Sequence, residues 1–90
     1  MRRKSRVDLN QPAVVAALRK AGATVQHLHT VGRGCPDIVV GFRGVNYMLE
    51  IKSDAGRLTA FEAAWLENWR GSAAVVYTVD DALKAIGAIE

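Results

Sequence analysis

The sequence contains one cysteine, Cys35, and lacks any long uninterrupted run of apolar residues. A single cysteine forms no internal disulfide and supplies no multi-cysteine zinc site. A helix that crosses a bilayer needs about 18 or more consecutive apolar residues, which excludes an integral membrane protein of this kind. Repeats and low-complexity stretches are also absent, and no hydrophobic segment follows the basic first residues as it would in a secretory signal. We therefore expect a cytoplasmic protein with no membrane partner.

The chain has little net charge once its first residues are set aside. It carries 12 Lys and Arg against 9 Asp and Glu, for a net charge of +3, but four of the cationic residues lie within residues 1–6. The remainder has 8 cationic residues against 9 acidic ones. We divide the chain into a basic arm, 1–6, and a single domain, 7–90. Such an arm suits contact with a polyanion such as DNA, or serves simply as a solvated tail. Its cationic residues are Arg2, Arg3, Lys4 and Arg6.

Half of the residues are apolar, and their spacing predicts three helices. The first begins after Asn10 as N-cap and stops at Gly22. The second begins after Thr59, where Glu62 three residues later completes the pattern of a capping box. The third begins after Asp80 as N-cap.

Apolar residues in alternation or in short runs predict four strands, over residues 24–29, 37–41, 45–52 and 73–77. Gly44 marks a turn between the second and third strands, which therefore form a hairpin. A helix then crosses over to the fourth strand. The resulting order, α-β-β-β-α-β-α, predicts an α/β fold in which helices flank a mixed sheet.

The residues that carry chemistry lie on this hairpin. Twelve residues separate Asp37 from Glu50, so both carboxylates can reach the same end of the two strands. Glu50 and Lys52 are two residues apart and share one face of their strand, whereas Leu49 and Ile51 point to the other face and suit a core. A surface ion pair is the plain alternative. A lysine and a carboxylate on one face between apolar runs are, however, hard to explain by packing.

Two carboxylates, from Asp37 and Glu50, and the backbone carbonyl of Ile51 offer hard oxygen ligands for Mg²⁺. A metal held there polarises a phosphodiester oxygen and lowers the pKa of a bound water. Lys52 would hold or deprotonate the attacking water and offset the charge that develops on phosphorus. The pattern therefore predicts a metal-dependent phosphodiesterase with Asp37, Glu50 and Lys52 as its catalytic residues.

Pro36-Asp37 followed by Glu50-Ile51-Lys52 resembles the PD-(D/E)xK nuclease signature. With Gly34-Cys35 ahead of it and a helix on either side, the chain from residue 8 to 89 resembles the VRR-NUC branch, the virus-type replication and repair nucleases, in its minimal stand-alone form. The resemblance implies a restriction-endonuclease-like core, dependence on Mg²⁺ or Mn²⁺, and hydrolysis that leaves a 5′-phosphate. It also implies a homodimer that acts on branched DNA such as four-way junctions, in the host cytoplasm if the protein is viral.

Within this resemblance, Asp37 and Glu50 match the metal ligands and Lys52 matches the catalytic lysine. The family often has a glutamate in the first helix, where this chain has Gln11, and a neutral amide binds a cation less strongly. The family also tends to have a glutamine early in the helix after the lysine, and Glu62 holds that place. We expect Gln11 and Glu62 to support the site, although a polar residue at a helix start and a capping box also account for them.

Two cationic residues of predicted loops, Arg33 and Arg57, are further candidates for DNA contacts. Loops commonly supply the side chains that bind phosphates. Arg33 lies between Gly32 and Gly34, and this glycine-containing loop gives DNA room near the metal.

The aromatic stripe of the second helix, Phe61, Trp65 and Trp69, is expected to lie in the core. If Trp69 or Tyr47 is exposed instead, it becomes a candidate for the contact between subunits of a dimer.

Two other functions compete with a nuclease. The first is a DNA-binding module that keeps the nuclease fold with weak or no activity, as the neutral Gln11 and the basic arm suggest. The second is a small metal module built from His27, His29 and Cys35, but a fourth zinc ligand is not evident and the spacing fits no common zinc pattern.

Overall fold

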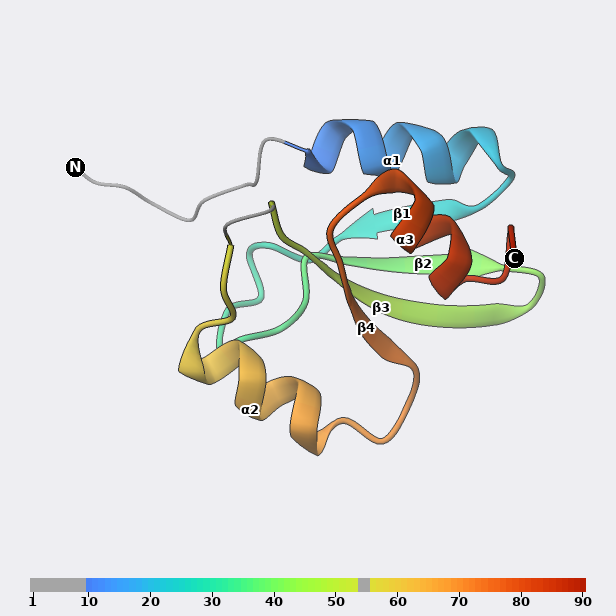
Figure 1. Cartoon of the computed structure of the whole chain (residues 1–90). Coiled ribbons are helices and arrows are strands. Elements are labelled where there is room, and N and C mark those ends of the chain that lie inside the picture. The colour runs from blue at the N-terminus through green and yellow to red at the C-terminus, as the bar shows by residue number, and fades with distance from the viewer. Residues whose placement is uncertain (1–9, 54–55) are drawn as a thin grey trace.

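A mixed sheet of four strands lies at the centre of the structure (Figure 1). The structure is a computed structural model that describes residues 10–53 and 56–90. The basic arm and its four predicted DNA contacts therefore lie outside the described residues. The elements are α1 (Gln11–Lys20), β1 (Thr24–His27), β2 (Ile38–Phe42), β3 (Val45–Ile51), α2 (Ala60–Asn68), β4 (Ala73–Val76) and α3 (Val79–Ala85).

The strands lie in the order β1-β2-β3-β4. β1 pairs with β2 and β2 with β3 in antiparallel fashion, whereas β3 and β4 are parallel. The mixed sheet and the order of elements confirm the predicted α/β class. The register places Ile38 opposite Leu49 and Ile51 opposite Val76, so that apolar side chains from β2, β3 and β4 gather on one face of the sheet.

The β2–β3 hairpin closes through a two-residue turn, Arg43-Gly44, as the position of Gly44 predicts. Both residues have positive φ, 53° for Arg43 and 82° for Gly44. Positive φ at both central positions is the mark of a type I′ turn, whose twist matches that of the flanking strands. The turn therefore sets the register of the hairpin, and the register decides which side chains meet at its far end.

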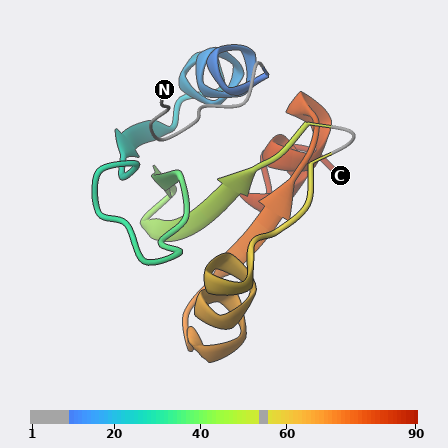
Figure 2. The same ribbon diagram turned by 90° about the vertical axis from the view of Figure 1, so that its left-hand side faces the viewer.

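The two faces of the sheet are covered unequally. α1 and α3 pack against each other on one face, and α2 lies on the other (Figure 2). The face under α1 and α3 holds the core, where Leu18, Ile38, Ile51 and Ile86 are each at most 2% exposed. α2 buries none of its residues. Among the described residues, no helix is both long and apolar enough to cross a bilayer.

The prediction that the aromatic residues of α2 lie in the core was wrong. Phe61 is 74% exposed and Trp69 is 46% exposed. Trp65 is half-buried, and its ring stacks on that of Trp69 with centroids 4.4 Å apart. Apolar residues occur all around this helix, so their spacing does not mark one buried side, and the aromatic rings pack on each other at the surface.

Three local boundaries also differ from the predictions. Thr78, and not Asp80, caps α3, because the Thr78 hydroxyl accepts a hydrogen bond from the Asp81 N–H at 3.0 Å. β1 ends at His27 instead of continuing to residue 29. Asn10 precedes α1 but makes no side-chain capping bond. Its Nδ2 instead donates to two backbone carbonyls, those of Lys52 at 3.1 Å and Tyr77 at 2.8 Å.

Asn10 thus joins the start of α1 to the chain just beyond β3 and β4, which suggests a test. We expect Asn10→Ala to lower the free energy of unfolding by about 1–2 kcal/mol, because two carbonyls lose a donor. Urea denaturation measures the loss. Asn68→Ala is the matched control, since the Asn68 amide bonds only to Ala64 within α2. Equal stabilities for the two variants would contradict this role of Asn10.

Candidate active site

The hairpin brings Asp37 and Glu50 to the same end of the sheet. Ile38, the first residue of β2, pairs with Leu49, so Asp37 comes just before β2, close to where Glu50 stands on β3. The Asp37 carboxylate accepts a hydrogen bond from the Ile51 N–H, with 2.7 Å between Oδ2 and N. Asp37 therefore takes the place of a strand partner for the end of β3.

Glu50 is a buried carboxylate, only 2% exposed. Burial raises its pKa, and the negative charges of Asp37 and then Glu62 raise it further, to about 8. The ammonium of Lys52, 3.3 Å away, lowers the pKa but does not offset the other effects. The site therefore holds more negative charge than its own lysine neutralises.

Lys52 is held between two carboxylates. Its Nζ lies 3.3 Å from Glu50 Oε2 and 2.9 Å from Glu62 Oε1. Burial alone would lower the pKa of Lys52, but the contacts with Glu62 and Glu50 outweigh it and raise the pKa. The ammonium is consequently fixed in position and keeps its charge.

Glu62 belongs both to the helix cap and to the site. Its Oε1 accepts the Thr59 N–H at 2.9 Å, and the Thr59 hydroxyl accepts the Glu62 N–H at 3.1 Å, as the predicted capping box requires. The same Oε1 lies against Lys52. Burial opposes its ionisation, but the Thr59 N–H and Lys52 more than compensate, and the pKa of Glu62 is lowered. Side chains in the first turn lean back toward the helix start, a rule that could have placed Glu62 near Lys52.

A glycine allows the loop before Asp37 to approach α2 closely. A side chain at Gly34 would collide with the backbone carbonyl of Phe61, and Gly34 also has a positive φ of 82°. This contact places the first turn of α2, which carries Glu62, beside the strand end that carries Asp37. The positive φ and the close contact each exclude other residues at this position. The sequence had suggested only that the loop containing Gly34 leaves room for DNA.

Gln11 is buried, as its position on the inner side of α1 predicts, with 4% of its surface exposed. Its Nε2 lies 3.4 Å from Nδ1 of His27 on β1. Its Oε1 is buried without a hydrogen-bond partner in the described part of the chain. The structure thus places Gln11 against a histidine that the sequence had suggested only as a zinc ligand.

The donor set at the hairpin end fits a hard divalent cation. The Ile51 N–H faces Asp37, and because the N–H and C=O of a strand residue point to the same side, the Ile51 carbonyl also faces that way. Two carboxylates and this carbonyl are oxygen ligands of the kind that Mg²⁺ and Mn²⁺ take. The raised pKa of Glu50 has the direction expected for a carboxylate placed to receive a cation.

The structure does not support the alternative of a zinc module. Within residues 10–53 and 56–90, no three His, Cys, Asp or Glu side chains are grouped so as to hold a metal. His27 and His29 meet edge to face with ring centroids 6.1 Å apart. Cys35 instead lies near Glu50 and Asp37, whose charges, after burial, raise the pKa of its thiol. A metal at the hairpin end would depend on the Ile51 carbonyl and on water for its remaining ligands.

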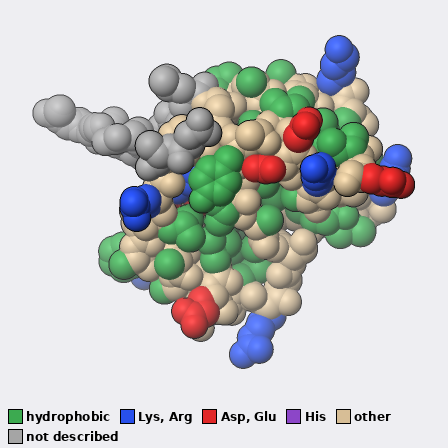
Figure 3. All heavy atoms as spheres, viewed as in Figure 1, with side chains coloured by type: hydrophobic (Ala, Val, Ile, Leu, Met, Phe, Trp, Pro, Cys, Tyr) green, Lys and Arg blue, Asp and Glu red, His purple; other side chains and the backbone are tan. Residues whose placement is uncertain are grey.

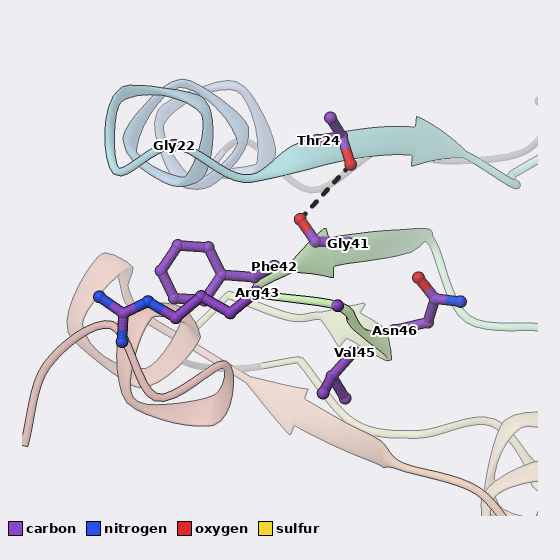
Figure 4. A pocket seen from close by; sticks show the side chains of 8 residues that line it. Gly22, Thr24, Gly41, Phe42, Arg43, Val45 and Asn46 are labelled. Atoms are coloured by element: carbon purple, nitrogen blue, oxygen red, sulfur yellow. Dashed lines mark hydrogen bonds between the residues drawn. The ribbon is translucent and has the colours of Figure 1, made fainter.

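The predicted DNA contacts within the described residues, Arg33 and Arg57, are exposed in loops. On the face shown in Figure 3, basic and acidic side chains are interspersed, with apolar side chains between them. A hollow of about 360 Å³ at the turn of the hairpin contains another arginine, Arg43, whose guanidinium lies 4.6 Å from the ring centre of Phe42 (Figure 4). This hollow is at the opposite end of the hairpin from Asp37, and none of its described lining residues is acidic.

The raised pKa of Glu50 gives a stability prediction. Below about pH 4.5 Glu50 is protonated in both the folded and the unfolded protein. The folded protein keeps that proton until about pH 8. The folded state therefore loses stability as the pH rises from 4.5 through 8. Glu50→Gln removes this loss, so in EDTA we expect it to gain about 5 °C or more in Tm over wild type at pH 8.5, roughly 1 kcal/mol, and much less at pH 5.

The control is Glu67→Gln, which changes an exposed carboxylate on α2. Its Tm difference from wild type should stay constant between pH 5 and 8.5. If the Tm difference between Glu50→Gln and wild type is the same at pH 5 and at pH 8.5, the assignment of the raised pKa to Glu50 is refuted.

Comparison with known proteins gives one informative result. No family model and no curated protein matches the sequence. A solved structure described as a VRR_NUC domain matches with a TM-score of 0.69 and 26% sequence identity, over 84% of this chain and 88% of that one. This match confirms the resemblance to the VRR-NUC branch that the motif residues indicated. It also indicates a nuclease domain. The chain therefore has the fold of a VRR-NUC domain.

Proposed function

We propose that the protein is a metal-dependent DNA endonuclease. The observation that carries this proposal is the cluster at the end of the β2–β3 hairpin, where the carboxylate of Asp37 lies near that of Glu50 and Glu50 lies 3.3 Å from the ammonium of Lys52. The similarity to a VRR_NUC domain supports hydrolysis of a nucleic acid as the chemistry. The surplus of negative charge supports dependence on Mg²⁺ or Mn²⁺.

In this proposal, Asp37, Glu50 and the Ile51 carbonyl hold the metal. The bound metal would polarise the phosphate and activate water. Lys52, kept charged by Glu62 and Glu50, donates hydrogen bonds to the attacking water and to the phosphate oxygens, and offsets the charge that builds up there. The water oxygen bonds to phosphorus and releases one proton to the solvent, the bond to the 3′ oxygen breaks, and that oxygen takes up a proton from the solvent, which leaves a 5′-phosphate.

The substrate we propose is branched DNA, including four-way junctions. The exposed Arg33 and Arg57 lie in the loops before β2 and after β3, and in this proposal they would bind phosphates on either side of the cut. The basic arm would add contacts that do not depend on sequence. We place this activity in the cytoplasm, of a host cell if the protein is viral, where the free thiol of Cys35 remains reduced.

The activity is tested with a panel of four-way junction, flap, splayed-arm, duplex and single-stranded DNA in Mg²⁺ or Mn²⁺. We expect cleavage of a branched substrate and none in EDTA. Lys52→Ala should reduce the rate by roughly 100-fold or more while DNA binding persists, because its ammonium acts on the reacting phosphate. Lys84→Ala, an exposed lysine on α3, is the control. Undiminished cleavage by Lys52→Ala, or cleavage in EDTA, would refute the mechanism.

A DNA-binding module without activity is the second candidate, and Gln11 favours it. A neutral amide stands where the family often has a metal-binding glutamate, and its hydrogen-bond neighbour is His27. This candidate predicts salt-sensitive binding to the same DNA panel and no cleavage with either metal. Turnover of any substrate by wild type would eliminate it.

We also propose that the protein acts as a homodimer that pairs through α2. Phe61 is exposed on this helix, Leu58 is exposed just before it, and Trp69 is exposed just after it. A nine-residue helix that buries no residue gains little from its own hydrogen bonds, so a second copy that covers these apolar side chains would stabilise it. A two-fold arrangement would also provide two sites, one for each strand of a junction.

The dimer is tested by light scattering during size-exclusion chromatography. Wild type should elute with twice the mass of one chain at micromolar concentration, and Phe61→Lys should elute as a monomer, because it places a charge in the apolar contact. Val45→Lys, an exposed apolar residue near the hairpin turn, should stay dimeric. A monomeric wild type, or dimers of both variants, would contradict pairing through α2.

A further inference from the structure

A second hollow, of about 430 Å³, lies between α1 and β1. Pro12, Val15 and Arg19 line it from α1, at the spacing that puts residues on one side of a helix. His27 lines it from the end of β1, and His29 lines it from the turn that follows this strand. The hollow therefore has an apolar wall on the helix side and two imidazole rings on the strand side.

The polar groups of this hollow suit an uncharged or electron-rich ligand joined to an anion. None of its described lining residues is acidic, and Arg19 is cationic. The two imidazoles meet at an interplanar angle of 69°, so together they form a corner and not a single plane. Gln11 also lines the hollow. Only 4% of its surface is exposed, and its Oε1 has no hydrogen-bond partner among the described residues.

The hollow adjoins the candidate active site. His27 pairs with Ile38, the residue after Asp37. The N–H of Leu28, which stands between the two histidines, donates to the backbone carbonyl of Asp37 at 2.8 Å. His27 faces the α1 side of the sheet and Glu50 faces the opposite side, so a DNA strand whose phosphate lies against Asp37 and Glu50 would reach His27 and His29 by bending around the end of the sheet at Asp37.

From these contacts, we propose that the hollow binds one unpaired nucleobase of the DNA strand next to the phosphate that is cut. A volume of about 430 Å³ is at the small end of ligand sites, large enough for one base and too small for a base pair with its backbone. The base would stack on an imidazole, as unpaired bases do on aromatic side chains. Arg19 would bind the attached phosphate.

The inference rests on the proposed nuclease function and narrows its substrate class. A strand with an unpaired nucleotide near the cut would be preferred over a continuous duplex, because only an unpaired base can leave the stack and enter the hollow at low cost. The preference for branched DNA would then have a physical origin in this chain, since junction points and flaps provide such nucleotides.

The test compares binding to three DNAs that differ at one position. Each is a flap duplex with the same backbone, carrying at the flap base a normal unpaired nucleotide, an abasic nucleotide, or a nucleotide paired by an added strand. Affinities are measured by fluorescence anisotropy in EDTA with the Lys52→Ala protein, so that no cleavage occurs. We expect the unpaired base to bind roughly tenfold more tightly than the abasic site, as a stacked base contributes about 1–3 kcal/mol.

Two variants locate this preference. Ala16→Trp adds a large side chain at an exposed residue that lines the hollow, and His27→Ala removes a stacking surface. Both should lower affinity for the unpaired base to that for the abasic DNA and leave the abasic affinity unchanged. Ala13→Trp, an exposed position on the same helix but outside the hollow, is the matched control and should keep the preference. Because the three changes are at exposed residues, folding should be retained, and circular dichroism checks it.

Equal affinities of the parent protein, which is the Lys52→Ala protein without a further substitution, for the base-bearing and abasic DNAs would overturn the proposal. So would an Ala16→Trp protein that keeps the preference, or one that loses affinity for both DNAs equally. A fluorescent base analogue, 2-aminopurine, at the flap position should be quenched on binding by the parent protein and by Ala13→Trp, but not by Ala16→Trp. Since no cleavage is measured, a protein that shows the base preference but never cuts DNA would refute the nuclease and leave the base site standing.

Discussion

The burial of Glu50 beside other carboxylates is the constraint on which the site depends. The register that packs Leu49 into the core turns Glu50 toward the opposite face, where Asp37 and Glu62 also point their charges. One ammonium, that of Lys52, does not balance three carboxylates, and the pKa of Glu50 rises to about 8. Excess negative charge lowers the stability of the metal-free fold, and in the proposed function it would raise the affinity for a divalent cation, so the repulsion that weakens the fold would also prepare the site.

The exposed helix α2 is tied to the rest of the molecule chiefly through the site. Its first turn is held by the capping box of Thr59 and Glu62, by the Glu62–Lys52 ion pair, and by the close approach of Gly34 to Phe61. Its remaining length buries no side chain. A change in how α2 is covered, by a second copy or by DNA, would therefore act first on the position of Lys52. In the proposed homodimer, assembly and chemistry would therefore be coupled through this one turn.

Most of the fold was predictable because its signals are local. Alternation over β3 separated Leu49 from Glu50, Gly44 marked the hairpin turn, and the spacing of Thr59 and Glu62 marked the start of α2. The predictions failed where a residue's role depends on distant partners. The amide of Asn10 bonds to carbonyls 42 and 67 residues away and not to its own helix.

The exposure of the α2 aromatic residues and the contact between Glu62 and Lys52 likewise follow from where the crossover places α2, which no spacing within the helix records.

The structure also separates what maintains the fold from what performs the chemistry. Side chains on the α1 and α3 face form the core, whereas those of Glu50 and Lys52 project from the other face, and Asp37 joins the two by replacing a strand partner for Ile51. If the proposed function holds, a substitution at Glu50 would therefore abolish activity and still raise stability.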